Sequence, residues 1–397
     1  MRLTTTLLAI ALLFTSAAAA QTFQTFYTFS GADGSFPNGD LIRDGAGNFY
    51  GTTQFGGTSN RGVVFKLSSS GQQTVLYNFT GGTDGGIPIG RLLASGGSLY
   101  GITALGGDPT CLCGTVFQLD RSGQLTVLHS FAGGTDGMQN QGQPELGLLL
   151  INGNFYGAAS FGGVQGCDGT LGCGVIFQVT PNGDESVLYR FTAQADGGFP
   201  QDLIRDQAGN LYGETGGSYM AGNAGTIFKM DTAGNLKTLY TFPGGTTGTS
   251  PRWRLTHTAD GVLHGVTQFG GDSTCALGSI GCGVVFSVDS TGTEQVLHTF
   301  GQKARDGEEP SGALLSAADS FYGVTVYGGI TNATCTFGCG VVYRVADNGK
   351  YAVVYRFTGA ADGWSPSGGL TPDSAGNLYG TTFLGGNGVG VVYKIVP

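Results

Sequence analysis

An aromatic-glycine pair recurs seven times along this chain of 397 residues and constrains the fold more than any other feature. The pairs are Tyr50-Gly51, Tyr100-Gly101, Tyr156-Gly157, Tyr212-Gly213, His264-Gly265, Tyr322-Gly323 and Tyr379-Gly380. Each pair lies among four short segments of β-rich composition, which in the first unit are residues 41–43, 48–53, 63–67 and 74–79. A long repeat with four strands predicts one blade of a β-propeller per unit, each blade burying its faces against its neighbours.

Composition supports an all-β chain of short strands and tight turns. The 75 glycines would each weaken the interior of a helix by about 1 kcal/mol relative to alanine, which excludes a helical bundle. The glycines follow no three-residue period, and 40% of the residues are hydrophobic, so the chain is neither collagen-like nor disordered. Turns such as Asp44-Gly-Ala-Gly-Asn48 join the segments as hairpins.

The order of the segments predicts how the ring closes. The seventh unit ends after its third strand, at residues 391–395, whereas the chain begins with an isolated fourth strand at residues 24–29. We therefore expect the first strand to complete the last blade, giving a closed seven-bladed propeller in a single domain, residues 21–397. An open solenoid is the alternative, but it would leave both terminal units exposed.

The repeat resembles a known family. The motifs Gly-Asn-Phe-Tyr-Gly-Thr-Thr-Gln-Phe-Gly-Gly at 47–57, Gly-Val-Val-Phe-Lys-Leu at 62–67 and Phe-Thr-Gly-Gly-Thr-Asp-Gly at 79–85 are similar to the Gly/Val-rich GloVer tandem repeat of secreted bacterial proteins. The resemblance covers essentially the whole chain after residue 20. It implies a propeller fold and secretion, and it transfers no catalytic residues.

The first 20 residues predict export from the cytoplasm. They combine Arg2, an apolar stretch from Leu7 to Phe14 and a run of small residues that ends in an Ala-x-Ala site before Gln21. This pattern is typical of a secretory signal peptide, since the apolar stretch is too short to span a bilayer. Cleavage would remove Arg2 and change the formal charge from −9 to −10, which disfavours nucleic acid as a partner. We expect a secreted or periplasmic monomer without a membrane span.

Eight cysteines form four pairs, each in the loop between the second and third strands of a unit. In an exported protein this pairing predicts four local disulfides, although the ring of the first pair is so small that bridging needs a sharp bend. Structural zinc is disfavoured because each loop offers two sulfurs and no histidine. The pairs are Cys111 with Cys113, Cys167 with Cys173, Cys275 with Cys282, and Cys335 with Cys339.

An aspartate repeats in the loop between blades in six of the seven units, and Thr247 takes its place in the other. Carboxylates at this spacing could form an acidic collar that binds calcium, a cationic ligand or a polyhydroxylated one. A residue that six units share is also typical of a turn cap that every blade needs for folding. Otherwise we expect no cofactor. The residues are Asp33, Asp84, Asp136, Asp196, Asp306 and Asp362.

The fifth unit departs most from the repeat, and departures are where function is best sought. Trp253, with Arg252 and Arg254 beside it, could form a platform for a sugar ring or a carboxylated ligand. The alternative is that Trp253 fills a gap between blades while the arginines pair with Asp40 or Asp202. His257 and His264 are more typical of structural histidines than of a catalytic pair.

The sixth unit carries the densest charge cluster, Arg305-Asp306-Gly-Glu308-Glu309. Paired carboxylates cleave glycosidic bonds when they are held a few ångströms apart, but Glu308 and Glu309 could equally be solvated loop residues. The third unit has an amide-rich loop, residues 138–143, suited to hydroxyl groups. No nucleophile elbow, phosphate loop or zinc-protease motif occurs.

These observations favour a secreted, non-catalytic binding or scaffold propeller that presents loops to an extracellular carbohydrate or protein. The rival hypothesis is an extracellular carbohydrate-active hydrolase or lyase that uses acidic loop residues. A convergent pair of carboxyl groups with raised pKa would favour the enzyme.

Overall fold

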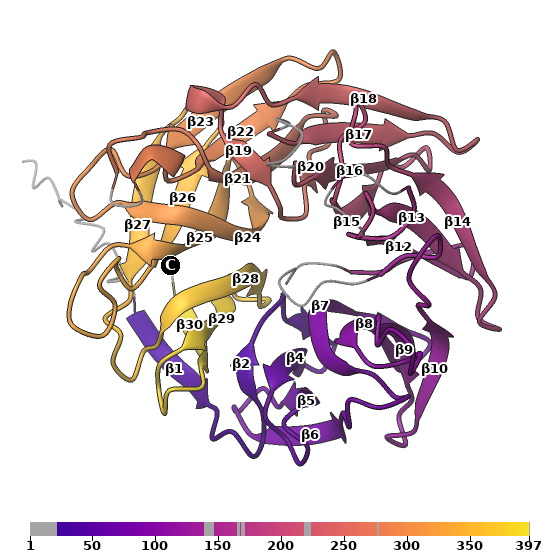
Figure 1. Ribbon diagram of the computed structural model, residues 1–397. Coiled ribbons are helices and arrows are strands. Elements are labelled where there is room, and N and C mark those ends of the chain that lie inside the picture. Colours follow the sequence, from indigo (N-terminus) through magenta and orange to yellow (C-terminus); the bar gives the residue numbers. More distant parts are fainter. Residues whose placement is uncertain are drawn as a thin grey trace, which may run out of the picture.

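The computed structural model describes residues 22–138, 147–164, 167, 171–217, 224–275 and 278–396. These residues form seven antiparallel sheets arranged as blades around a ring (Figure 1), which confirms the predicted all-β seven-bladed propeller. The predicted signal peptide lies outside the described residues. Among the described residues, no helix is long and apolar enough to cross a membrane.

Each blade runs from an innermost strand at the axis to an outermost strand at the rim, and the innermost strand is split in blades 1 and 5. Blade 1 contains β2 (Ser35–Pro37), β3 (Ile42–Arg43), β4 (Phe49–Phe55), β5 (Val63–Leu67) and β6 (Gln73–Asn78). Blade 2 contains β7 (Gly86–Ser95), β8 (Ser98–Leu105), β9 (Thr115–Leu119) and β10 (Leu125–Ser130). Blade 3 contains β11 (Leu149–Ile151), β12 (Asn154–Ala159), β13 (Val175–Val179) and β14 (Glu185–Arg190).

The second half of the ring follows the same order. Blade 4 contains β15 (Pro200–Arg205), β16 (Leu211–Thr215), β17 (Thr226–Met230) and β18 (Leu236–Thr241). Blade 5 contains β19 (Thr249–Pro251), β20 (Thr256–His257), β21 (Leu263–Phe269), β22 (Val284–Val288) and β23 (Glu294–Thr299), with short 3-10 helices η1 (Gly245–Thr247) and η2 (Gly278–Ile280) in its loops. Blade 6 contains β24 (Gly307–Ala317), β25 (Ser320–Gly328), β26 (Val341–Ala346) and β27 (Tyr351–Arg356). Blade 7 contains β28 (Trp364–Pro372), β29 (Leu378–Leu384), β30 (Val391–Val396) and β1 (Thr22–Thr28).

The first strand closes the ring, as the segment order predicts. Strand β1 pairs antiparallel with β30, from Thr22 opposite Val396 to Thr28 opposite Val391. Figure 1 shows these two strands side by side, in the indigo and yellow of the two ends of the sequence. Because β1 pairs with β30, the seventh blade has four strands like the others, and the two ends of the chain close the ring.

The repeated aromatic-glycine pair has a packing cause. In blade 1, a β-carbon on Gly51 would lie 2.7 Å from the ring of Phe65 on β5 and 2.9 Å from Leu41. Phe65 is fully buried, so the ring occupies the space that a side chain on β4 would need. The glycine is therefore required wherever the third strand supplies this large aromatic residue.

Two sets of loops share one face of the ring, as expected for this fold. The loop between the second and third strands contacts the turn that enters the same blade, through backbone hydrogen bonds such as Gly57 N to Gly31 O (2.9 Å) and Gly107 N to Gly82 O (3.0 Å). We call this side of the molecule the loop face. The cysteines and the repeated aspartates lie on it.

Candidate functional site

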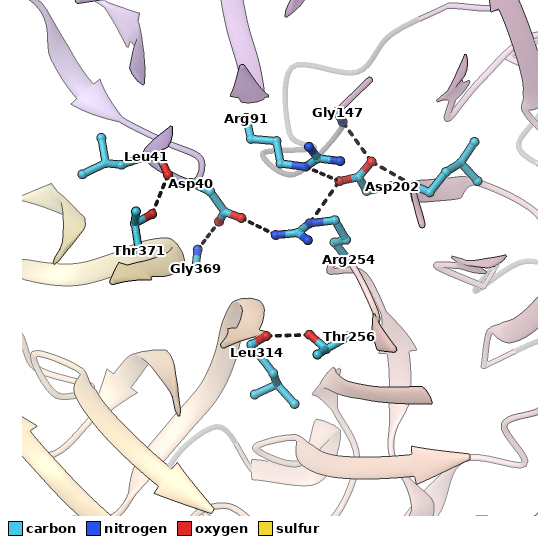
Figure 2. Close-up of polar contacts among 11 residues, drawn as sticks. Asp40, Leu41, Arg91, Gly147, Asp202, Arg254, Thr256, Leu314, Gly369 and Thr371 are labelled. Carbon is cyan, nitrogen blue, oxygen red and sulfur yellow. Dashed lines mark hydrogen bonds and ion pairs between the residues drawn. The ribbon is translucent and has the colours of Figure 1, made fainter. Parts of the chain in front are cut away.

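The innermost strands bring one residue from each blade to the ring axis, immediately before a buried leucine. Figure 2 shows the side chain of Arg254 between the carboxylates of Asp40 and Asp202. The seven axial residues are Asp40, Arg91, Gly147, Asp202, Arg254, Ala313 and Gly369.

Four of these residues form an ion-pair network across the axis. Arg254 Nη2 lies 2.7 Å from Asp40 Oδ2, and Arg254 Nε lies 3.6 Å from Asp202 Oδ2. Arg91 Nε lies 3.2 Å from the same oxygen of Asp202. The network of Asp40, Arg91, Asp202 and Arg254 thus joins blades 1, 2, 4 and 5, and its two positive and two negative charges cancel.

Burial and backbone donors hold the two aspartates in place. The side chain of Asp202 is fully buried, whereas that of Arg254 remains 27% exposed. The backbone N–H of Gly147 donates to Asp202 (3.2 Å), and that of Gly369 donates to Asp40. Because buried charges need compensating partners, the charges of this network are used within the ring and are not free for a ligand.

A second polar group lies nearer the loop face, between blades 5 and 6. Arg252 Nη1 donates to Gln268 Oε1 (2.6 Å), and Gln268 Nε2 donates to Glu309 Oε1 (2.5 Å). Gln268 lies on β21 just before its loop, and Glu309 lies near the start of β24. We call Arg252, Gln268 and Glu309 the polar row. Each of the three residues is partly exposed, so the row is accessible from outside.

The row is electrostatically coupled to an aromatic neighbour. Burial raises the pKa of Glu309, while the amide of Gln268 and the charge of Arg252 oppose that shift. Burial also lowers the pKa of Arg252. The pKa of Tyr327, on β25, is raised by burial and then by the Glu309 carboxylate. Guanidinium, amide, carboxyl and phenol groups thus gather at one edge of the loop face.

Trp253 does not join the arginines in an exposed platform. Its side chain is 7% exposed, and its indole N–H donates to the carbonyl of Pro310 in blade 6 (3.1 Å). It packs with Val266 and Leu314 in a buried cluster between blades 5 and 6. Trp253 therefore fills a gap between blades, as the alternative sequence hypothesis expected. That hypothesis also expected the arginines to pair with Asp40 or Asp202, and Arg254 pairs with both.

The two histidines of blade 5 lie on opposite sides of their sheet. His257 is opposite Leu263 in the β20–β21 pair, and its ring lies 5.7 Å from that of Tyr212 in blade 4. His264 stacks on Phe321 of blade 6 at 4.2 Å, and its Nε2 lies 2.8 Å from Asp347 Oδ1. Burial lowers the pKa of His264 despite that carboxylate. Their separation gives no shared site to this pair.

The repeated aspartates act as caps for the turns between blades. Asp84, for example, accepts hydrogen bonds from the hydroxyl of Tyr77 (3.0 Å) and the backbone N–H of Thr80 (2.9 Å). The partner is a tyrosine or histidine at the end of the preceding outer strand in every case. The pairs are Asp33 with Tyr27, Asp84 with Tyr77, Asp136 with His129, Asp196 with Tyr189, Asp306 with His298 and Asp362 with Tyr355.

Where the collar lacks its aspartate, another carboxylate lies nearby. Thr247 takes the place of the aspartate, and the hydroxyl of Tyr240 is left without that partner. The pKa of Tyr240 is raised by burial and next by Glu294, which begins the outer strand of the following blade. Glu294 therefore supplies the missing negative charge from a different position in the repeat.

The charge cluster of the sixth unit is divided among different roles. Asp306 is a collar residue, Glu309 belongs to the polar row, and Glu308 lies opposite Tyr327 in the β24–β25 pair. The backbone carbonyl of Arg305 accepts a hydrogen bond from the side chain of Arg356 (3.1 Å). The cluster is thus part of the ordered edge of blade 6.

A buried carboxyl group that sequence analysis did not single out lies between blades 4 and 5. Glu214 is fully buried on β16, and neither carboxyl oxygen has a hydrogen-bond partner of good geometry among the described residues. Burial raises its pKa well above the usual range, and the backbone N–H of Trp253 opposes this only in part. Burial therefore favours the protonated, uncharged form of the Glu214 carboxyl group.

All four predicted disulfides are formed, including the one that closes the smallest ring. Cys111 and Cys113 are bonded with their Cα atoms 5.2 Å apart, so the loop makes the sharp bend that this ring needs. The other three bonds, with their Cα separations, join Cys167 with Cys173 (5.0 Å), Cys275 with Cys282 (6.2 Å), and Cys335 with Cys339 (5.2 Å).

Two further sequence hypotheses concern metal ions and the amide-rich loop. The described part of the chain contains no group of three or more His, Cys, Asp or Glu side chains that could hold a metal ion. Most of the amide-rich loop of unit three, residues 139–143, lies outside the described residues.

The structure therefore divides the predicted site residues between two places. Arg252 and Glu309 meet in the polar row, whereas Arg254 joins the axial network and Trp253 is buried. Sequence analysis missed Gln268, which connects the row, and Arg91, which completes the network. The signal for Gln268 was present in the repeat, because only blades 1 and 5 place glutamine after this threonine.

Comparisons with known proteins agree on the fold. The family model of the Gloeobacter/Verrucomicrobia repeat matches residues 10–171, 138–337 and 272–397. No curated protein sequence matches the chain. Among solved structures, virginiamycin B lyase from Staphylococcus aureus is 11% identical over 95% of this chain and 99% of its own, with a TM-score of 0.59.

A second solved structure is the extracellular domain of a protein from B. thetaiotaomicron. It is 13% identical over 94% of this chain and 40% of its own, with a TM-score of 0.55. At these identities the likeness extends to the propeller architecture and carries no activity from either protein.

Proposed function

This chain belongs to the Gloeobacter/Verrucomicrobia repeat family, and from that premise we propose that it is a secreted, non-catalytic propeller that binds a carbohydrate on its loop face. Export is supported by the predicted signal peptide at residues 1–20 and by four disulfides, which persist in oxidising compartments. The binding site is the polar row with Tyr327.

The observation that carries this proposal is the hydrogen-bonded chain from Arg252 through Gln268 to Glu309. Neighbouring hydroxyl groups of a sugar both donate and accept hydrogen bonds, and this row offers guanidinium and amide donors beside carboxyl and amide acceptors. Its members already hold one another in place, so binding orders few side chains. Tyr327 adds an aromatic surface next to the row.

The second candidate function is an extracellular carbohydrate-active enzyme. It is favoured by the raised pKa of Glu309, because a protonated carboxyl group beside a sugar could act as a general acid. The enzyme hypothesis lacks a second accessible carboxyl group beside Glu309. Glu214 also has a raised pKa, but it is fully buried between blades. Two accessible, convergent carboxyl groups are needed for glycoside cleavage.

One experiment separates the two candidates. Purified residues 21–397 are incubated with cellulose, chitin, starch and soluble xylan, and retained protein and released sugars are measured in the same tubes. The binding module predicts retention on at least one polysaccharide without products. Release of sugars would establish the enzyme instead. If neither retention nor sugar release were detected, these carbohydrates would be excluded as ligands.

The matched variants are Gln268→Ala, Glu309→Gln and Lys237→Ala. Gln268→Ala breaks the row while leaving its charges, so retention should fall. Glu309→Gln keeps the shape and an acceptor oxygen, so it reduces retention less for a binding module and abolishes product release for an enzyme. Lys237, on the outer strand β18, is exposed and its variant should behave as the unaltered protein.

A further inference from the structure

The large hydrophobic side chains that the fold leaves exposed are concentrated in the disulfide loops. Among the described residues, four of the seven such side chains lie between the two cysteines of a disulfide, one in each loop. They are Leu112 (42% exposed), Leu171 (40%), Ile280 (42%) and Phe337 (53%). We call these four residues the loop tips. They belong to blades 2, 3, 5 and 6 and lie on the loop face.

The disulfides beside the loop tips are largely buried. Seven of the eight cysteines are at most 7% exposed, and the disulfides pack against the turns between blades. A β-carbon on Gly359 would lie 3.0 Å from Cys335 Sγ, and one on Gly133 would lie 3.2 Å from Cys113 Sγ. Each disulfide thus anchors to the blade the two cysteines on either side of an exposed tip.

Hydrogen bonds fix the loops further. In blades 2, 5 and 6 the segment before the disulfide has the same sequence pattern, an Asp or Asn followed two residues later by Thr and then Cys. The carboxylate of Asp108 accepts from the backbone N–H of Thr110 (2.7 Å), and that of Asp272 accepts from Thr274 (2.7 Å). The amide oxygen of Asn332 accepts from Thr334 (2.8 Å). Three different blades therefore present their tips from the same rigid turn.

The charge of these loops indicates the chemistry of what they contact. The four loops, residues 106–114, 162–174, 270–283 and 328–340, contain three aspartates and no lysine or arginine. The mature chain as a whole carries a formal charge of −10, the −9 of the full chain less Arg2. These four loops would repel an anionic lipid surface, whereas a basic surface would be attracted to them.

We propose that the four loop tips, Leu112, Leu171, Ile280 and Phe337, form a docking surface for a protein partner whose surface combines apolar pockets with lysine and arginine residues. Separate apolar side chains on rigid loops match separate pockets, and their rigidity reduces the entropy lost on binding. A polysaccharide would require flat aromatic faces, and Phe337 is the only aromatic tip. This surface adjoins the proposed carbohydrate site at one tip, where the ring of Phe337 lies 5.9 Å from that of Tyr327. The other three tips belong to neither the polar row nor Tyr327, so the surface adds a second partner to the proposed carbohydrate ligand.

The test uses a phage-displayed library of random peptides, selected on residues 21–397 and counter-selected on the triple variant L112S/L171S/I280S. These tips are exposed and their cysteines stay in place, so the variant should keep the melting temperature of the unaltered protein. Leu150→Ser is the matched control, because Leu150 is also an exposed leucine but lies on the innermost strand β11 outside these loops. Phosphatidylcholine vesicles are a second probe.

The proposal predicts enrichment of peptides in which Lys or Arg neighbours aliphatic or aromatic residues, binding the triple variant at least about tenfold more weakly and L150S unchanged. It is overturned if the enriched peptides bind the triple variant equally, if they lack basic residues, or if nothing is enriched. Vesicle binding that is lost in the triple variant would also overturn it in favour of a lipid surface. Retention on polysaccharides depends on the polar row and should be the same in the triple variant, so failure of either proposal is recognised separately.

Discussion

The outer and inner rims of the loop face differ in how closely they follow the repeat. At the outer rim an aspartate recurs in six blades and is bound each time by a Tyr or His of the preceding blade. At the inner rim, between blades 5 and 6, the polar row of Arg252, Gln268 and Glu309 occurs once. Since every blade must fold but a single ligand needs only one site, the repeated residues serve folding and the unrepeated row is the place to seek function.

The axial network shows that a departure from the repeat can also be structural. Replacing Arg254 by alanine removes one of the two guanidinium groups that pair with the buried carboxylate of Asp202, and the guanidinium that pairs with Asp40. We expect the free energy of unfolding in urea to fall by about 3 kcal/mol, the largest effect of any variant considered. Lys237→Ala should change it by less than about 0.5 kcal/mol. An equally small effect for Arg254→Ala would mean that its charge is available to a ligand.

The buried Glu214 gives stability a pH dependence with a definite sign. In the unfolded chain this group loses its proton near pH 4.3, whereas in the folded protein it keeps the proton to a much higher pH. Between those limits the folded state binds more protons, so stability falls as the pH rises, by up to about 1.4 kcal/mol per pH unit. Glu214→Gln cannot ionise and should flatten this dependence of stability on pH. The free energy of unfolding of both proteins is measured in urea between pH 5 and pH 8. The same change with pH in both proteins would contradict the account.

A collar residue should matter for folding and not for binding. Asp84→Asn keeps the shape of the cap but weakens its charge-assisted hydrogen bonds to Thr80 and Tyr77, which should lower stability by about 1 kcal/mol. Asp319→Asn is the control, since Asp319 is exposed in an ion pair with Arg344 and contributes little. Loss of polysaccharide retention in a folded Asp84→Asn variant would assign the collar to ligand binding and remove the contrast between the two rims.

Calcium provides the smallest expected effect. The collar carboxylates are already bound by internal donors, such as the backbone N–H of Thr192 and the hydroxyl of Tyr189 for Asp196. A cation would have to displace those bonds, so millimolar calcium should leave the melting temperature unchanged. A rise that Asp196→Asn abolishes would establish the collar as a calcium site.

The repeat predicts neighbouring contacts well. The four strands of each blade, the closure of the ring by the first strand and the four disulfides all involve residues whose positions recur or adjoin in the sequence. The aspartate caps also follow from the pattern, because the partner lies seven or eight residues away in five of the six pairs.

Contacts across the axis are not specified by the pattern of one unit. Arg254 meets Asp40 over 214 positions of sequence, and the contact depends on the number of blades and on how far each innermost strand extends along the axis. The polar row likewise depends on more than its glutamine. Blade 1 has a glutamine, Gln54, at the position of Gln268, but it has no arginine or glutamate at the positions that match Arg252 and Glu309. To predict that the loop tips are exposed, one would need to know which side of each small disulfide ring faces the blade, and the sequence pattern does not specify this.

The most direct measurement compares retention on cellulose, chitin, starch and xylan for the unaltered protein, Gln268→Ala and Asp84→Asn under conditions where all three are folded. We predict that Gln268→Ala loses retention, that Asp84→Asn keeps it, and that no sugars are released. Equal retention by Gln268→Ala and the unaltered protein, or release of sugars by the unaltered protein, would contradict the assignment of the polar row as a non-catalytic carbohydrate site.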